Sequence, residues 1–172
     1  MKELKIVPKA QPVLDPGFIP AILWRRAYEE RTREVGGEPV SVAVEQDDAV
    51  SVSHVQILPH EGDYRTWNEK YVERLVKFLL WQKGGHTVKI AGPRELADFL
   101  ASTYSGSGKR AFDVDLMGNR VYGRPFRVEW VSRERLPEAR ETVQKLGGHL
   151  DGCRIGFDLG GSDRKCAAVI DG

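Results

Sequence analysis

The spacing of hydrophobic residues changes several times along the first half of the chain, and each spacing predicts a different element. Residues 18–35 repeat their apolar positions at helical spacing, which indicates an amphipathic helix that ends at Gly36-Gly37. Residues 40–46 and 50–58 instead alternate apolar and polar side chains, which is the period of a half-buried strand. The two strands together predict a β-hairpin.

A helix, a strand and another helix are expected next. Thr66 is followed three residues later by Glu69, the pattern of a helix capping box, and apolar residues at helical spacing continue to a pair of glycines. Residues 86–91 predict a short strand. Pro93 is expected to open a further helix, because proline is tolerated in the first helical turn.

The second half of the chain predicts two more hairpins with a helix between them. The expected elements are strands at 112–116 and 121–131, a helix at 137–146, and strands at 154–159 and 165–170. Gly118-Asn119 and residues 160–163 supply the two turns. We therefore expect a mixed α+β fold in which helices accompany antiparallel hairpins.

Composition and charge exclude several classes of function. The 172 residues are 41% hydrophobic and 30% charged, which is ordinary for a globular protein. The 26 Lys and Arg residues balance 25 Asp and Glu residues, so net charge does not favour nucleic acid or an anionic membrane surface. No apolar run approaches the ~20 residues that cross a bilayer, and the N-terminus does not resemble a signal peptide. We expect a cytoplasmic protein that binds neither nucleic acid nor membrane.

The cysteines and tryptophans are expected to be structural. Two cysteines are too few for a disulfide framework, and they lack the Cys-x-x-Cys spacing of metal sites. We expect Cys153 and Cys166 to be reduced, buried thiols. The tryptophans are expected at core or interface positions rather than as platforms for a sugar: Trp24, Trp67, Trp81 and Trp130.

The segment with the clearest chemical meaning lies near the C-terminus. An apolar strand ends in Asp158, a turn with Gly160, Gly161 and Ser162 follows, and Lys165 lies at the start of the next strand. Glycines let backbone N–H groups approach an anion closely and permit a positive φ, and successive amides form an anion-binding nest. Lysine suits phosphate, and a carboxylate can hold Mg²⁺ through water.

This segment resembles the first phosphate motif of ROK proteins and hexokinases, in the actin/hexokinase/Hsp70 ATPase superfamily. The resemblance covers about 19 residues and rests on Asp158-Leu159-Gly160-Gly161-Ser162, which is similar to the family's Asp-x-Gly-Gly-Thr/Ser. It implies that Asp158 assists Mg²⁺ through water and that Gly160, Gly161 and Ser162 contact the phosphates of ATP. Lys165 stands where hexokinases have a basic residue, whereas Asp163 departs from the usual Lys or Asn.

The resemblance also implies how the chain is organised. Residues 1–150 would be an accessory α+β domain, and residues 151–172 would begin an actin-like ATPase domain. The sugar-activating aspartate and the ROK zinc cluster are expected beyond Gly172, so no catalytic residue is assigned. We expect these 172 residues to be the front part of an ATP-dependent carbohydrate kinase that binds nucleotide and sugar, inactive by themselves. A homodimer stays open.

Two other interpretations of this segment remain. It could be a plain β-hairpin with a glycine turn in a structural or interaction domain, because short glycine-rich patterns are common. It could also bind another anion without catalysis, in a regulatory module. Titration with ATP and Mg²⁺ separates these interpretations from the kinase.

Other candidate sites have weaker support in the sequence. Residues 105–110 are expected to form a flexible loop, and they are not a Walker motif, since Thr103 and Arg110 occupy positions that require Gly and Ser or Thr. Asp113 and Asp115 would share one face of a predicted strand, most simply as a solvated edge. The histidines are too widely spaced to predict a metal site: His54, His60, His86 and His149.

Overall fold

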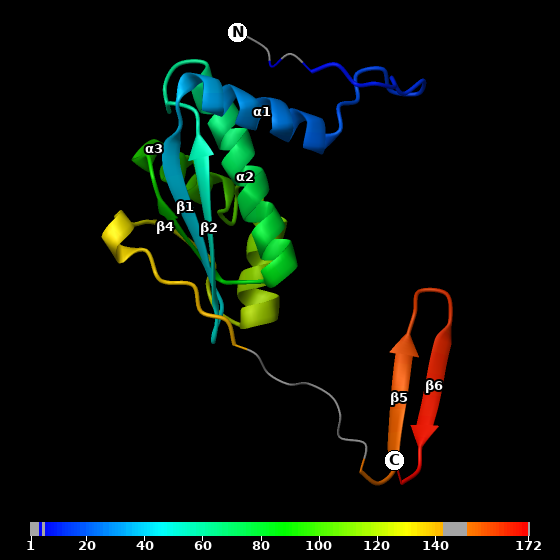
Figure 1. The fold of residues 1–172 in the computed structure, drawn as a ribbon. Helices are drawn as coiled ribbons and strands as arrows, with labels where there is room; N and C mark the ends of the chain where they lie inside the picture. Colours follow the sequence, from blue (N-terminus) through cyan, green and yellow to red (C-terminus); the bar gives the residue numbers. More distant parts are fainter. Residues whose placement is uncertain (1–3, 5, 143–150, 172) are drawn as a thin grey trace. The chain divides into compact units, whose positions relative to one another are not determined.

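Helices and strands alternate irregularly along the chain (Figure 1). The computed structural model describes residues 4, 6–142 and 151–171. It divides the chain into two units, Met1–Thr142 and Val143–Gly172. The domain boundary expected at residue 150 falls among residues 143–150, outside the described residues. Each unit is considered by itself below.

The first unit contains a four-stranded mixed sheet in the order β2-β1-β3-β4. The predicted hairpin is formed by β1 (Glu38–Glu45) and β2 (Val50–Ile57). β3 (Thr87–Ala91) is antiparallel to β1, and β4 (Arg127–Trp130) is parallel to β3. The mixed α+β fold class is therefore confirmed.

Three helices of the first unit pack against this sheet. They are α1 (Ala21–Val35), α2 (Tyr64–Lys83) and α3 (Arg94–Thr103). Val40, Val42 and Val44 of β1 are fully buried at the predicted spacing of two, but Ala43 between them is fully buried as well, so this part of β1 is buried on both faces rather than on one. The largest fully buried side chains come from both sheet and helices: Tyr28, Ile57, Leu58, Leu80, Ile90, Leu96 and Leu100.

Two helices begin elsewhere than predicted. α1 begins at Ala21, because Pro20 has an extended backbone with φ −53° and ψ 133°. α2 begins at Tyr64, before Thr66, and no side chain caps its first turn. The capping-box prediction is therefore wrong. The chain already turns at residues 61–65, where the Tyr64 amide donates to the Glu61 carbonyl oxygen at 3.1 Å.

The hairpin predicted at 112–131 is wrong. The chain forms α4 (Ala111–Val114) and continues as the π-helix η1 (Asp115–Tyr122) before it reaches β4. Gly118 lies inside η1 rather than in a turn, and a Cβ there would lie 2.9 Å from the Arg124 carbonyl oxygen and the Phe126 nitrogen. The close approach of the backbone of Arg124 and Phe126 to Gly118 therefore accompanies a helical structure here. The local alternation of apolar and polar residues does not reveal this contact.

The helix predicted at 137–146 is also wrong where the structure describes it. Residues 137–142 contain no helix, after the 3₁₀ turn η2 (Arg133–Arg135). Arg140 instead forms an antiparallel bridge with Val50, with N–O distances of 2.8 and 2.9 Å. Pairing with the sheet edge therefore replaces helical hydrogen bonds, and the rest of the predicted helix lies outside the described residues.

Within the described part of the chain, no helix has both the length and the apolar character needed to span a membrane.

Candidate functional site

The described part of the second unit is a two-stranded antiparallel hairpin. β5 (Arg154–Leu159) pairs with β6 (Arg164–Val169), and residues 160–163 connect them. The predicted strands are confirmed, with β6 beginning and ending one residue earlier than expected. The loop thus carries Gly160, Gly161, Ser162 and Asp163 at the tip of the hairpin.

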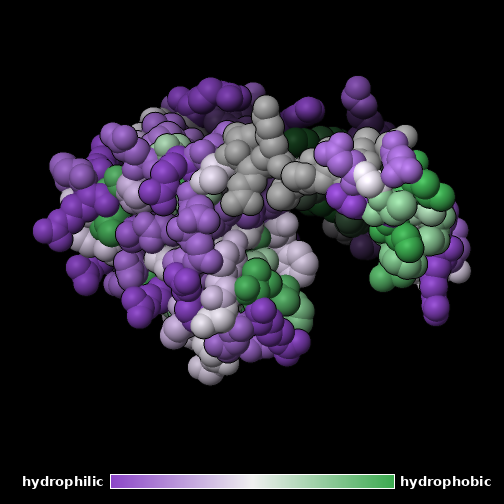
Figure 2. Space-filling view, turned by 90° about the horizontal axis from the view of Figure 1, so that it is seen from below, coloured by the Kyte–Doolittle hydropathy of each residue, from purple (hydrophilic) through white to green (hydrophobic). Residues whose placement is uncertain are grey.

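The pairing register gives the hairpin one apolar face, because successive residues of a strand point to opposite faces. Ile155 lies opposite Ala168, and Phe157 lies opposite Cys166. Figure 2 shows hydrophobic side chains gathered on this hairpin, and Phe157 is 71% exposed. Cys153 and Cys166 are also exposed, so the expectation of buried thiols is wrong. The two described strands have no second layer of their own that would cover these thiols.

The opposite face carries the predicted phosphate-binding charges. Asp158 lies directly opposite Lys165, and the Lys165 Nζ is 3.8 Å from Asp158 Oδ2 and 3.6 Å from Asp163 Oδ2. The adjacent pair on this face, Gly156 and Ala167, is small. A Cβ at Gly156 would meet only the Ala167 carbonyl oxygen, at 3.9 Å. The carboxylate and the ammonium group therefore have open space beside them.

Only one of the two glycines in the loop at the tip of the hairpin is required because a side chain would not fit. A Cβ at Gly160 would lie 2.8 Å from Asp163 Oδ1, whereas one at Gly161 would meet nothing within 4 Å. Neither glycine has a positive φ, so that part of the sequence argument is wrong. Among the described residues, no backbone hydrogen bond across the loop engages the amides of residues 160–163. Those amides and the exposed Ser162 hydroxyl can bind an external acceptor.

The residues on this face fit a magnesium-bound phosphate chain. Asp158 is a 69% exposed carboxylate, the kind of oxygen ligand that Mg²⁺ prefers. Lys165 supplies a compact positive charge, and the loop supplies free backbone donors. The structure thus brings together Asp158, Lys165 and the glycine loop. The site also contains Asp163. The carboxylate of Asp163 competes for Lys165 and partly offsets the attraction of the site for an anion.

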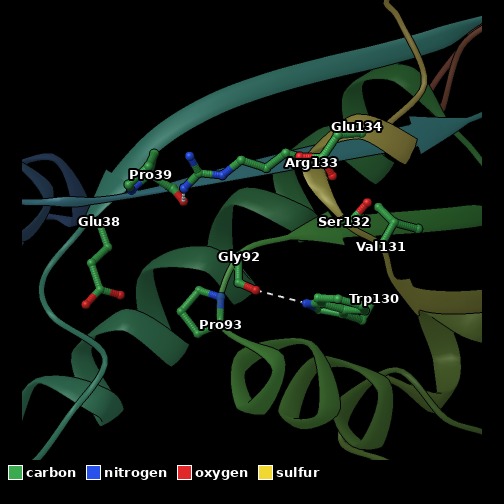
Figure 3. Close-up of a pocket in the computed structure, with 9 residues that line it drawn as sticks. All are labelled: Glu38, Pro39, Gly92, Pro93, Trp130, Val131, Ser132, Arg133 and Glu134. Atoms are coloured by element: carbon green, nitrogen blue, oxygen red, sulfur yellow. Dashed lines mark hydrogen bonds between the residues drawn. The ribbon is translucent and has the colours of Figure 1, made fainter.

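A cavity in the first unit is a second candidate site (Figure 3). Its volume is about 450 Å³, and it lies where β3 and β4 end and β1 begins. Trp130 Nε1 donates to the Gly92 carbonyl oxygen at 2.9 Å, and Arg133 Nη2 donates to the Pro39 carbonyl oxygen at 3.2 Å. The carboxyl ends of parallel strands are a common location for ligands in open α/β sheets. Trp130 and Arg133 line this hollow.

The charges around this cavity are mixed. Glu38 and Glu134 supply carboxylates, and Arg133 supplies a guanidinium group. A hydrogen bond from the Ser132 hydroxyl lowers the pKa of Glu134 below its usual value. Such an arrangement can bind a polar small molecule. The sequence did not reveal it, since residues from three separate strands meet only in the folded chain.

The tryptophans follow the prediction only in part. Trp24 and Trp67 are partly buried and pack against the core. Trp81 and Trp130 are 53% and 41% exposed, so of the predicted core or interface positions the core is excluded for both, and an interface position stays a prediction. Exposed tryptophan is a signal for binding surfaces, but the sequence alone does not distinguish it from the buried residue.

The remaining sequence candidates do not form sites. Residues 105–110 form a tight turn rather than an open loop, because the Arg110 amide donates to the Thr103 carbonyl at 2.9 Å. Asp113 is buried in α4 and binds Lys77 at 3.0 Å, whereas Asp115 is partly exposed and binds Arg120 at 2.7 Å. The shared strand face predicted for the two aspartates is therefore wrong. Among the described residues, no group of three His, Cys, Asp or Glu side chains could hold a metal ion.

Comparisons with known proteins leave the family open: no protein-family model, curated protein or solved structure matches the chain.

Proposed function

We propose that the hairpin of residues 154–169 is the first phosphate-binding hairpin of a cytoplasmic, ATP-dependent sugar kinase of the ROK/hexokinase type, with an actin-like ATPase fold. The observation that carries the proposal is the register, which pairs Asp158 with Lys165 on an open polar face beside a glycine loop. A plain structural hairpin does not require a carboxylate, a lysine and unpaired amides at one tip.

In this proposal each residue has a separate task. Asp158 holds Mg²⁺ through water, and Lys165 and the amides of Gly160, Gly161 and Ser162 hold phosphate oxygens. Bound Mg²⁺ neutralises charge on the phosphate chain. Lys165 would then leave its contact with Asp158 for the phosphates. The proposal assigns these residues the grip on phosphate only, since transfer to a sugar also requires a base and further phosphate contacts.

The apolar face of the hairpin supports the same proposal. Ile155, Phe157 and Leu159 are 66%, 71% and 77% exposed. A two-stranded hairpin is marginally stable alone, and an exposed apolar face calls for a second layer. An ATPase domain would supply that layer, with the polar face and its glycine loop left open to nucleotide.

Calorimetric titration with ATP and Mg²⁺ tests this proposal. The wild-type chain is expected to bind ATP in a magnesium-dependent manner. Asp158→Ala is expected to weaken binding about tenfold, the effect of one lost charge-assisted contact, and to abolish the magnesium dependence. Asp151→Ala, which removes an exposed carboxylate of the same unit outside the site, serves as the matched control. Equal binding by wild type and Asp158→Ala, or none by either, rejects the kinase proposal.

A regulatory or interaction module is the second candidate function. The cavity beside Trp130 favours it, because a hollow of about 450 Å³ at strand ends has the size of a small-molecule site. The same titration separates the two functions: a regulatory module that ignores ATP gives no heat with either variant.

A further inference from the structure

An apolar groove lies between the beginning of α1 and the middle of α2. Its volume is about 550 Å³, and Figure 1 shows α1 crossing α2 near the end of that helix where the chain enters it. Ile19 and Trp24 form one side, Leu75 and Phe78 form the other, and Val55 of β2 also lines it. Because the two helices cross rather than run side by side, the side chains between them do not close the gap.

The α2 side of the groove has the spacing of a helix-binding surface. Tyr71, Leu75 and Phe78 follow one another at i, i+4 and i+7, so they share one face of the helix. This row extends over about 10 Å, which is two helical turns. Phe78 is 59% exposed and Ile19 is 43% exposed. Large apolar side chains exposed around a groove mark an interaction site.

The charged residues that line the groove are all positive, and Glu29, which accepts from Arg25 and from the Tyr71 hydroxyl, is not among the lining residues. Arg25, Lys70 and Arg74 line it, and among the described residues no carboxylate does. Lys70 Nζ lies 4.5 Å from the centre of the Trp24 ring. Within the described chain, no carboxylate oxygen lies within 4.0 Å of that ammonium group.

The two arginines are only partly neutralised. Arg25 binds Glu29 at 2.7 Å, and Arg74 Nε lies 3.9 Å from Glu73 Oε2. The Arg25 side chain is 62% exposed and that of Arg74 is 70% exposed, so both can reach a second carboxylate. The groove therefore combines an apolar floor with a positive rim in a chain whose net charge is only +1.

We propose that this groove binds an amphipathic helix of a partner protein, with apolar residues on one face and Glu or Asp beside them. The apolar face would lie against Leu75, Phe78 and Ile19, in the helix-in-groove mode of recognition. The acidic residues would pair with Lys70 and Arg74, which gives orientation and partner choice. This function is separate from the proposed phosphate hairpin and does not depend on it.

Fluorescence polarisation with the full 172-residue chain tests the proposal. The probe is a labelled 14-residue helical peptide with Leu at i, i+4 and i+7 and Glu at the flanking positions; its twin has Lys in place of every Glu. We expect saturable binding of the Glu peptide at about 100 µM protein or below, and at least tenfold weaker binding of the Lys peptide. Affinity for the Glu peptide is expected to fall as salt rises.

Variants of exposed residues locate the binding. Reversing both charges, Lys70→Glu with Arg74→Glu, is expected to weaken the Glu peptide at least tenfold and to improve binding of the Lys peptide. Phe78→Ser is expected to weaken both peptides. The matched controls are Lys83→Glu, on the same helix outside the groove, and Phe112→Ser, since Phe112 is 62% exposed elsewhere. Both controls should bind as wild type does.

Three outcomes overturn the proposal. Equal binding of the two peptides would show that charge does not select the partner. Unchanged binding by Phe78→Ser and the charge-reversed variant would place the site elsewhere. If neither peptide binds, and sedimentation shows self-association that Phe78→Ser abolishes, a second copy of the chain occupies the groove instead.

Discussion

Asn68 is completely buried and links α1, α2 and the end of β2 through hydrogen bonds. The Tyr28 hydroxyl donates to Asn68 Oδ1 at 2.6 Å, and Asn68 Nδ2 donates to the Leu58 carbonyl oxygen at 2.8 Å. Asn68 Nδ2 also lies 3.3 Å from His60 Nδ1. As an amide N–H only donates, His60 Nδ1 accepts and the ring proton is on Nε2. His60 Nε2 is buried without a hydrogen-bond partner among the described residues.

This network predicts a pH dependence of stability. Burial lowers the pKa of His60, and the nearby Arg65 lowers it further, against smaller opposite effects of Glu69, Glu95 and Glu38. The unfolded chain, with a histidine pKa of about 6.5, therefore takes up a proton more readily than the folded chain. The contribution of His60 to the free energy of unfolding is therefore fully present above the unfolded pKa. It decreases as the pH falls through the unfolded pKa toward the lower pKa of the folded chain.

Urea unfolding at a series of pH values between about 7.5 and 5.5 measures this effect. His60→Gln removes the titrating group and keeps an acceptor for Asn68, so its stability should depend less steeply on pH than that of wild type. Superimposable pH profiles for the two proteins would show that His60 does not titrate differently in the folded chain.

At the scale of elements, periodic segments were predictable and segments decided by tertiary contact were not. The β1–β2 hairpin and α2 follow their hydrophobic periods, because one buried face repeats along each. η1 was missed because Gly118 is packed against the backbone of Arg124 and Phe126. The bridge of Arg140 with Val50 joins residues 90 positions apart, and no local pattern indicates it.

Gly118→Ala is expected to destabilise the protein by about 2 kcal/mol, since the added Cβ would lie 2.9 Å from two backbone atoms that cannot move independently. Gly106→Ala is the matched control: its Cβ would meet nothing within 4 Å, and its φ is not positive. We expect that variant to unfold within about 0.5 kcal/mol of wild type. Equal losses in the two variants, measured by chemical denaturation, would contradict the packing assigned to η1.

The candidate sites also divide into one that local sequence predicts and others that depend on tertiary contacts. Asp158, Lys165 and the glycine loop were predictable, because all of them belong to one hairpin and its register follows from the alternation of apolar residues. The cavity beside Trp130 and the groove beside Phe78 were not. Their residues come from strands and helices that are distant in the sequence and meet only through the order of the sheet.

At the scale of the whole molecule, the two units have separate sources of stability. The buried hydrophobic cluster is drawn entirely from residues of the first unit. In the second, most side chains of β5 and β6 are exposed. Stability of the first unit is therefore expected to be independent of the hairpin.

A chain of residues 1–142 is expected to fold and to melt within about 2 °C of the full chain, because its core is complete. Circular dichroism during heating measures this difference. A much lower melting temperature, or loss of the cooperative transition, would show that residues 143–172 contribute to the core of the first unit.

Amide NMR shifts test the central claim, that the backbone after Asp158 grips phosphate. On addition of ATP and Mg²⁺ to the ¹⁵N-labelled chain, the amides of Gly160, Gly161 and Ser162 are predicted to shift with saturation, while those of Gly106 and Gly123 in the first unit stay in place. As a control, nuclear Overhauser effects between Ile155 and Ala168 in the same sample show that the hairpin is formed. Unchanged loop amides in a chain with those contacts would contradict the account.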